Sequence, residues 1–325
     1  MRGLILSAGL GERLRPLTLK KAKPAIEFLN APMLAFPYFW LSSLELSDIV
    51  FNTHYLPDTV RHAAVHSVQP NVRLHFSHEE EILGSGGGIW KARFDLNDGN
   101  TFAVANGDGV ILHPDREIFV KMKKEHESTG ALATILVCPL PGVGKEIPGV
   151  WIQGQKVVGF GMSSPVTGAF CRHYASYMLF SPKLWSLLPD GRSNILYDVL
   201  VTAIDKGDLV RAFEVPDLIW YETGRVKDYL EATADCIRHL REGTPYGSTL
   251  EVLLQKHSVP FDQHSIPEKG LLIANSARVE EAVDFGGFVV VGDDVHLRSG
   301  TKVEDCVLLP GADVPRGTYS RQVID

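Results

Sequence analysis

Residues 3–24 read GLILSAGLGERLRPLTLKKAKP, and this stretch decides the fold class. Its apolar start, residues 4–6, has the length and composition of a buried strand. The loop Gly9-x-Gly11 follows directly, and backbone N–H groups in such a loop can approach phosphate oxygens because glycine has no side chain in the way. A plain strand-to-helix turn would carry the same two glycines. The stretch therefore predicts a strand followed by a glycine turn, with phosphate binding as one of two interpretations.

Three cations follow the glycines. Arg13, Arg15 and Lys23 lie close together in a chain whose formal net charge is −7. Each cation alone would be a solvated surface residue, but the group of three favours an anionic ligand. Leu14 stands where a dinucleotide-binding fingerprint needs its third glycine, and no Gly-Lys-Ser/Thr follows. A Rossmann oxidoreductase and a P-loop enzyme are therefore disfavoured.

Short apolar runs alternate with helical patterns over the first 240 residues. Strands are expected at 3–7, 48–53, 72–77, 101–105, 131–138, 150–153, 156–160, 174–180, 209–214 and 218–221. Helices are expected at 32–46, 57–67, 87–94, 115–127, 193–206 and 226–242. This order is typical of an α/β fold with a mixed, mostly parallel sheet, in which ligands bind at the carboxyl ends of the strands.

The end of the chain has a different period. Apolar residues occupy every sixth position, at Ile273, Val279, Phe285, Val291, Leu297, Val303 and Leu309. This period is typical of a parallel β-helix, and the run is long enough for about two to three coils. We expect an α/β domain over 1–245, a linker over 246–270 and a short left-handed parallel β-helix over 271–325. So short a β-helix needs a surface against its end, which favours docking or a homo-oligomer.

Composition excludes several classes of protein. Hydrophobic residues make up 45% of the chain and charged residues 22%, as in ordinary globular proteins. With 39 acidic and 32 basic residues and no long basic run, we expect no nucleic acid and no membrane among the partners. The longest apolar stretch, 31–41, is too short to span a bilayer. The four cysteines lie far apart without a CxxC motif, which favours a cytoplasmic protein with reduced thiols.

From Ala8 to Pro24 the sequence resembles the signature of the sugar-1-phosphate nucleotidyltransferases, Gly-x-Gly-x-Arg-Leu-x-Pro-Leu-Thr with Lys-Pro soon after. The resemblance extends over residues 1–242, and the β-helix tail matches the longer members. It implies a Rossmann-like, GT-A-like catalytic domain whose substrates are an NTP and a sugar 1-phosphate.

The resemblance also assigns roles within the loop. The backbone at Ala8, Gly9 and Gly11 would hold the nucleotide phosphates. Arg13 would contact the pyrophosphate leaving group, and Lys23 the α-phosphate.

Residues 78–88 read HEEEILGSGGG. Taken alone, three carboxylates before small residues predict a solvated acidic turn that opens a helix. The stretch resembles the base-binding segment of mannose-1-phosphate guanylyltransferases, which implies nucleotide contacts at Glu79, Gly84 and Ser85, with the glycines letting the base lie against the backbone. A carboxylate at Glu79 suits guanine, because guanine presents two adjacent N–H donors, whereas a reader of uracil would more simply be glutamine. We therefore expect GTP.

Residues 105–109 read ANGDG and end a predicted strand. A lone aspartate at such a place is usually a turn residue. The resemblance implies that Asn106 contacts the nucleotide and that Asp108 is a catalytic metal ligand. The family's second ligand is the aspartate of Trp-x-Asp-x-Gly, and here Glu222 takes its place. Glutamate is also a hard oxygen ligand for Mg²⁺, the implied cofactor, but its carboxylate lies one methylene further out.

The sugar region departs most from the family. Members often carry Glu-Lys-Pro after a strand, and residues 160–165 read FGMSSP instead. The family's Asn-x-Gly segment ends here at Ser176. The resemblance implies sugar contacts at Ser176 and at the backbone of Gly149. Arg172 and His173 are candidates to replace the missing cation, and the alternative for both is a surface loop. Mannose, a heptose and N-acetylmuramate all remain open as the sugar.

The implied activity is the transfer of a nucleotidyl group from GTP to mannose 1-phosphate or a similar sugar 1-phosphate, in one in-line displacement that releases pyrophosphate, in the synthesis of cell-envelope polysaccharide. One alternative is a uridylyltransferase acting on another sugar 1-phosphate, such as N-acetylmuramate 1-phosphate. Another is a non-catalytic regulatory homologue that binds a nucleotide sugar. Glu222 and the altered sugar loop favour the regulatory homologue, and the intact Arg13, Lys23 and Asp108 oppose it.

Overall fold

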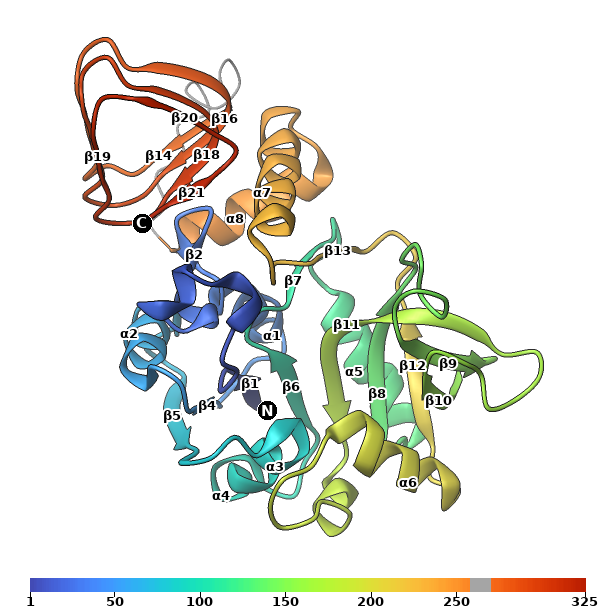
Figure 1. Cartoon of the computed structure of the whole chain (residues 1–325). Coiled ribbons are helices and arrows are strands. Elements are labelled where there is room, and N and C mark those ends of the chain that lie inside the picture. Colours follow the sequence, from blue (N-terminus) through green and yellow to red (C-terminus); the bar gives the residue numbers. More distant parts are fainter. Residues whose placement is uncertain (258–269) are drawn as a thin grey trace.

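The computed structural model of the chain describes residues 1–257 and 270–325. An α/β part is followed by a stack of C-terminal strands, which stands at one end of the molecule beside helix α7 (Val226–Arg241) and helix α8 (Pro245–Lys256) (Figure 1). None of the described helices is long and apolar enough to cross a bilayer.

A nine-stranded sheet forms the frame of the α/β part, in the order β5-β4-β1-β6-β11-β8-β12-β10-β9. Its strands are β1 (Arg2–Leu6), β4 (Asp48–Thr53), β5 (Arg73–His78), β6 (Phe102–Asn106), β8 (Ala133–Cys138), β9 (Gly149–Gln153), β10 (Lys156–Gly161), β11 (Phe170–Phe180) and β12 (Val210–Glu214). Strands β5, β4, β1 and β6 pair in parallel, as do β8 and β12, whereas β11, β10 and β9 make antiparallel pairs. The sheet is mixed, and the expectation of mostly parallel strands holds for its first half.

Both faces of this sheet are buried, as the continuous apolar runs of its strands predict. Ile5 and Phe51 belong to one apolar cluster, and their sequence neighbours Leu4 and Val50 to another, because successive side chains of a strand point to opposite faces. The first cluster receives side chains from α1 (Ala35–Ser42), α2 (Pro57–Ser67), α5 (Ile118–Thr129), α7 and α8, and the second from α3 (Gly84–Lys91), α4 (Arg93–Leu96) and α6 (Val201–Asp205). The α/β part therefore has three layers.

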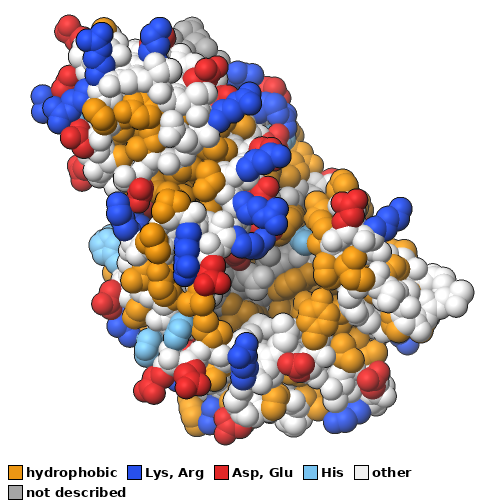
Figure 2. Space-filling model, viewed as in Figure 1, with side chains coloured by type: hydrophobic (Ala, Val, Ile, Leu, Met, Phe, Trp, Pro, Cys, Tyr) orange, Lys and Arg blue, Asp and Glu red, His pale blue; other side chains and the backbone are white. Residues whose placement is uncertain are grey.

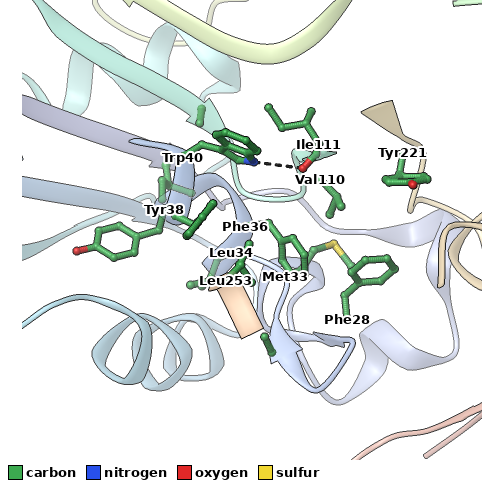
Figure 3. Close-up of a cluster of buried hydrophobic side chains, with 14 of the residues drawn as sticks. Phe28, Met33, Leu34, Phe36, Tyr38, Trp40, Val110, Ile111, Tyr221 and Leu253 are labelled. Atoms are coloured by element: carbon green, nitrogen blue, oxygen red, sulfur yellow. Dashed lines mark hydrogen bonds between the residues drawn. The ribbon is translucent and has the colours of Figure 1, made fainter. Parts of the chain in front are cut away.

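Aromatic side chains from residues 28–40 pack together in the first apolar cluster (Figure 3). The ring of Phe28 meets that of Phe36 edge-on at 5.3 Å, and the indole N–H of Trp40 donates to the carbonyl of Ile111 at 3.2 Å. The buried indole thereby keeps its hydrogen bond while its ring adds apolar contact. This packing holds α1 against the strand that carries Ile111.

Helix α1 is shorter than the predicted helix over 32–46. Strand β3 (Ala31–Pro32) pairs with β2 (Glu27–Phe28) in a short hairpin, so the chain is extended where the helix was expected to begin. Beyond the helix, Glu45 takes a left-handed conformation with φ of 53°, which ends helical geometry. A second short pairing joins β7 (Val110–Leu112) to β13 (Ile219–Tyr221).

The prediction of a linker over 246–270 is wrong for its first half, which forms a helix. Helix α8 occupies Pro245–Lys256, and the side-chain hydroxyl of Thr244 caps its start by accepting from the N–H of Gly247 at 3.1 Å. Leu250 and Leu254 of this helix are buried in the first apolar cluster. Its amphipathic period lies in a stretch whose glycine, proline and histidine content suggested a connector. The rest of the expected linker, 258–269, lies outside the described residues.

The C-terminal strands are parallel. They are β14 (Leu271–Ile273), β15 (Arg278–Val279), β16 (Asp284–Val291), β17 (His296–Leu297), β18 (Lys302–Leu308), β19 (Asp313–Val314), β20 (Thr318–Ser320) and β21 (Val323–Ile324). Leu271 pairs with Val289, 18 residues on, Val289 with Cys306, 17 residues on, and Lys302 with Thr318, 16 residues on. The spacing therefore starts at three times six residues, as the sequence period predicts, and shortens toward the end.

The strand stack shares a core with the α/β part. Leu272, Val290 and Val307 belong to the same apolar cluster as Phe28. At the rim, the side-chain amide of Asn30 donates to the carbonyl of Val291 at 2.9 Å. The β2–β3 hairpin and α7 thus supply the surface that a short strand stack needs.

Candidate active site

The parallel strands of the first half end together at one edge of the sheet. Leu6 of β1 pairs in register with Asn52 of β4 on one side and with Asn106 of β6 on the other. The loops that leave these strands therefore start side by side. Residues that are about 50 and 100 positions apart in sequence meet here, as expected for ligand sites of parallel sheets.

The loop after β1, residues 7–15, is called the glycine loop below. Gly11 has φ of 63°, in the left-handed region, and a Cβ there would lie 2.9 Å from Cγ2 of Thr18. The fold itself therefore requires this glycine. A Cβ at Gly9 would meet nothing within 4 Å, although Gly9 lines a pocket. Ala8, the first predicted contact, is buried at the start of the loop.

A pocket of about 460 Å³ opens against the glycine loop. Arg13, Lys23, Asp108 and Gly224 line it together with the two glycines. Figure 2 shows this face hollowed near its centre, with Lys and Arg side chains gathered along the upper side of the hollow. The structure thus brings Arg13, Lys23 and the predicted metal ligand Asp108 into one cavity. Arg15, the third predicted cation, is not among the residues that line it and pairs with Glu12 at 3.3 Å.

Each cation of the pocket faces a carboxylate. Lys23 Nζ lies 2.6 Å from Asp108 Oδ2, and Arg13 Nη1 lies 3.6 Å from Glu222 Oε2. The second oxygen of Glu222 accepts the N–H of Gly224 at 2.6 Å. Lys23 is only 7% exposed, so its ammonium is held largely by this one ion pair. An incoming phosphate would compete with Asp108 and Glu222 for the two cations.

The donor set fits a cation that is shared with a nucleotide. No group of three or more His, Cys, Asp or Glu side chains within residues 1–257 and 270–325 is arranged to hold a metal ion. Mg²⁺ is commonly held by only one or two carboxylates, with phosphate oxygens and water completing its shell. Asp108 and Glu222 supply such oxygens beside the pocket, and the Asp108 side chain is 38% exposed there.

The base segment, residues 78–88, borders the same pocket through Ile82. Glu79 does not face it. This side chain is 1% exposed, and its carboxylate accepts from Asn52 Nδ2 at 2.7 Å and from the N–H of Leu83 at 2.9 Å. The role of Glu79 as the reader of the base stays a prediction.

Packing against a neighbouring loop requires glycine at several positions of the base segment, which the sequence did not predict. A Cβ at Gly84 would lie 2.6 Å from the carbonyl oxygen of Ser193, and one at Gly87 would lie 2.4 Å from that of Gly191. The N–H of Gly86 donates to the same Ser193 carbonyl at 2.9 Å. The backbone of the 191–193 loop therefore occupies the Cβ side of these glycines, and their contact with a base stays a prediction.

Ser85 also faces this loop. Its hydroxyl accepts the N–H of Ile195 at 2.9 Å, at the start of the π-helix Ile195–Leu200. Ser85 thus makes a packing contact in this structure, and its nucleotide contact stays a prediction.

Asn106 is the last residue of β6, and Asp108 lies in the tight turn that follows. The N–H of Gly109 donates to the carbonyl of Asn106 at 3.0 Å. A Cβ at Gly107 would lie 2.9 Å from the carbonyl of Leu6, so glycine lets this turn approach β1 closely. The turn carries Asp108 to the pocket and leaves Asn106 partly exposed at its edge.

Residues 2–141 match the protein family described as "Nucleotidyl transferase". Over these residues the chain is similar to this family. Among curated relatives, the mannose-1-phosphate guanyltransferase of Hypocrea jecorina is 27% identical over 330 residues, which cover 100% of this chain and 85% of the relative. The enzyme of the same name from Schizosaccharomyces pombe is 29% identical over 250 residues, or 75% of this chain and 67% of the relative.

A solved structure shares the fold. The UDP-glucose pyrophosphorylase from Acinetobacter baumanii superimposes with a TM-score of 0.63 at 18% identity, covering 78% of this chain and 98% of that one. The α/β nucleotidyl transferase fold is therefore supported for most of the chain. The family match begins at β1, the strand that precedes the glycine loop.

The two expected sugar contacts lie in different surroundings. Ser176 of β11 packs against the Asp108 turn, where a Cβ at Gly109 would lie 2.8 Å from its Cβ. A Cβ at Gly149 would lie 2.4 Å from Sγ of Cys171. Glycine is needed at 149 because strand β11 pairs closely with β9, so its packing gives no sign of a ligand.

Neither candidate for the missing cation supplies a free positive charge. Arg172 forms an ion pair with Glu214 and donates to the carbonyl of Cys171 at 3.0 Å. The ring of His173 lies 4.1 Å from that of Trp220, and burial lowers its pKa to about 4, so it is neutral at pH 7. Arg172 and His173 therefore do not replace the cation of the charged triplet that the resembling family carries.

Two residues near the site were not identified from the sequence. Trp220 donates its indole N–H to the hydroxyl of Ser176 at 3.4 Å, and thereby joins β13 to the expected sugar side. Asn52 hydrogen-bonds to both the glycine loop and Glu79. A polar residue near the carboxyl end of a buried strand was the signal that could have identified Asn52.

Proposed function

We propose that this chain transfers a nucleotidyl group from an NTP, specifically GTP, to a sugar 1-phosphate of the mannose type. The products are an NDP-sugar and pyrophosphate. The observation that carries the proposal is the pocket in which the glycine loop, Arg13, Lys23 and Asp108 meet. The names of the relatives that cover the chain support the same substrate class.

The residues of the pocket suit an in-line displacement at the α-phosphorus. The glycine loop would hold the phosphates through its N–H groups, Lys23 would neutralise charge at the α-phosphate, and Arg13 would do so at the departing pyrophosphate. Asp108 and Glu222 would hold Mg²⁺, which supplies charge neutralisation to the phosphates when bound. No covalent enzyme intermediate is required, so catalysis consists of positioning and electrostatic stabilisation.

One observation favours a second candidate function. Both oxygens of Glu222 are near protein groups, the N–H of Gly224 and the guanidinium of Arg13. A non-catalytic homologue that binds a nucleotide sugar and regulates a partner would need no metal ligand at this place. The buried Lys23 beside Asp108 favours the enzyme.

A pyrophosphate-release assay with Mg²⁺ tests the proposal. GTP, UTP, CTP, ATP and dTTP are each paired with mannose 1-phosphate, glucose 1-phosphate and N-acetylmuramate 1-phosphate. We expect release with GTP and mannose 1-phosphate. A clear preference for UTP would overturn the guanine assignment in favour of a uridylyltransferase, and no release with any pair would overturn the enzyme in favour of the regulatory homologue.

We also propose that the C-terminal strands are a short left-handed β-helix and that copies of the chain associate through it in the cytoplasm, in a pathway of cell-envelope polysaccharide. The 18-residue spacing of the first parallel pairs supports the β-helix. The shared apolar core with Phe28 argues against a fully separate tail domain, so we place the boundary after α8. Sedimentation of the intact chain and of a Val279→Glu variant, altered at an exposed apolar residue of the tail, tests the association.

A further inference from the structure

A buried amide joins the glycine loop to the base segment. Oδ1 of Asn52 accepts the N–H of Ser7, the first residue of the glycine loop, at 2.6 Å. Nδ2 of the same side chain donates to Oε1 of Glu79 at 2.7 Å. Asn52 is 3% exposed, so both hydrogen bonds lie away from water. An amide is the side chain that can accept on one side and donate on the other in this way.

Glu79 extends the connection to the helix that follows. Its second oxygen accepts the N–H of Leu83 at 2.9 Å, directly before α3. The backbone N–H of Glu79 donates to the carbonyl of Thr53 at 2.7 Å. Ser7, Asn52, Glu79 and Leu83 therefore form one hydrogen-bonded chain across the carboxyl edge of three strands.

The packing of α3 leaves no spare room around this chain of contacts. A Cβ at Gly88 would lie 2.8 Å from Asn52 Nδ2 and 2.9 Å from Glu79 Oε1. The glycine lets the helix rest directly on the amide and the carboxylate. A buried carboxylate is costly unless its oxygens are hydrogen-bonded, so the fold depends on the donors of Asn52 and Leu83 to keep Glu79 in place.

Ile82 connects these contacts to the pocket. It lies between Glu79 and Leu83, the two anchored residues, and its side chain lines the cavity beside the glycine loop. Glu79 is 1% exposed, so its carboxylate does not line the pocket in this structure. It affects the pocket through the position of Ile82.

We propose that Asn52 is a positioning residue for the nucleotide: through Glu79 it fixes the base segment relative to the glycine loop, and so sets nucleotide affinity and base preference. The inference rests on the proposed function and extends it to the choice of base. A purely structural asparagine would affect stability without changing which nucleotide binds.

A reciprocal exchange tests the pair. In Asn52→Asp, the new carboxylate faces that of Glu79 across a 2.7 Å contact, so two like charges repel. In Glu79→Gln, the amide N–H₂ must face either the N–H of Leu83 or the N–H₂ of Asn52, so one of the two hydrogen bonds is lost. In the double variant the new carboxylate accepts from Ser7 and from the new amide, whose oxygen accepts from Leu83. Every group is satisfied again with the roles reversed.

Calorimetric titration with GTP and with ITP, which lacks the 2-amino group of guanine, is the readout, together with KM and kcat. We expect Asn52→Asp to weaken GTP binding and raise the KM for GTP at least about tenfold, with a smaller GTP-to-ITP preference and kcat changed by less than about threefold. The double variant should recover GTP affinity to within about threefold of the parent. The matched control is Thr53→Val, a buried polar neighbour on the same strand, which should lower the unfolding temperature without changing nucleotide affinity.

The outcomes separate this inference from the proposed function. If the parent chain binds no nucleotide among GTP, UTP, CTP and ATP, the proposed function fails, and the nucleotide role of Asn52 fails with it. If the parent binds and a folded Asn52→Asp variant binds equally well, only the inference fails. A double variant that stays as weak for GTP as Asn52→Asp also overturns it, because Glu79 would then contact the base directly.

Discussion

The ammonium of Lys23 donates to Oδ2 of Asp108 at 2.6 Å, although 85 positions separate the two residues in sequence. Lys23 is buried, whereas more than a third of the Asp108 side chain is exposed at the pocket. Under the proposed function, a phosphate would compete with Asp108 for this buried cation. This pair links the segment between β1 and β2 to the turn after β6.

Asp108→Ala should abolish turnover while the protein stays folded. Loss of the carboxylate removes a proposed metal ligand and the partner of Lys23, so we expect pyrophosphate release to fall by at least about a hundredfold. The free energy of unfolding should fall by about 1–3 kcal/mol, as for other buried charges that lose a hydrogen-bond partner. Asp58→Ala, which removes an exposed carboxylate paired with Arg61 on α2, is the control and should change neither quantity. Full activity of the Asp108 variant would refute the assignment.

Glu222→Gln should raise the Mg²⁺ concentration that gives half-maximal activity by at least about tenfold, equivalent to roughly 1.4 kcal/mol. The amide oxygen still accepts the N–H of Gly224, but the charge beside Arg13 is gone. Because both side chains of this ion pair are more than a third exposed, thermal stability should hardly change. An unchanged Mg²⁺ dependence would show that Glu222 serves only Arg13 and Gly224.

Two glycine substitutions should separate a packing glycine from a binding glycine. Gly87→Ala places a methyl group 2.4 Å from the carbonyl of Gly191, so we expect the free energy of unfolding to fall by about 1–3 kcal/mol. Gly9→Ala meets no neighbour, yet the residue lines the pocket. Chemical denaturation should leave the Gly9 variant unchanged, while titration with GTP shows weaker binding. The reverse pattern would contradict the assignment of these two glycines.

His126 should make the protein less stable in mild acid. Burial lowers its pKa to about 4, against 6.5 for an exposed histidine, so the unfolded chain binds the extra proton between these values. The stabilisation is therefore complete above pH 6.5 and is lost as the pH falls toward 4, by about 3 kcal/mol in total at 1.36 kcal/mol per pKa unit. Urea unfolding at pH 7.5, 6 and 5 measures this. His126→Gln, which keeps a hydrogen-bonding group for Thr134, should flatten the profile. Parallel profiles for the two proteins would contradict the argument.

Strand positions followed well from sequence because each buried strand is a short apolar run between turns. The largest shift was at β11, which begins at Phe170 instead of 174. Register and direction did not follow, because β11 is antiparallel to both β6 and β8 and a run of apolar residues does not encode direction. Helix α8 was missed since its apolar period lies in a stretch that also contains turn-forming residues.

The arrangement of the candidate functional residues could likewise be predicted only in part from the sequence. Arg13, Lys23 and Asp108 were predicted to meet, and they line one pocket, because parallel strands present their ends at one edge. The glycines of the base segment were interpreted as room for a ligand, but Gly84 and Gly87 also make room for the loop at 191–193, more than 100 positions away. A glycine in a sequence indicates that space is needed and does not say what fills it.

The sequence by itself determined the alternation of strands and helices, the glycine loop, the charged residues around it and the six-residue period of the tail, because these depend on local spacing and chemistry. Only the tertiary structure decided which charges pair, that Glu79 faces Asn52 instead of the pocket, and that the tail shares its core with Phe28. Those relationships join residues far apart in sequence. They depend on strand order and packing, which no local pattern specifies.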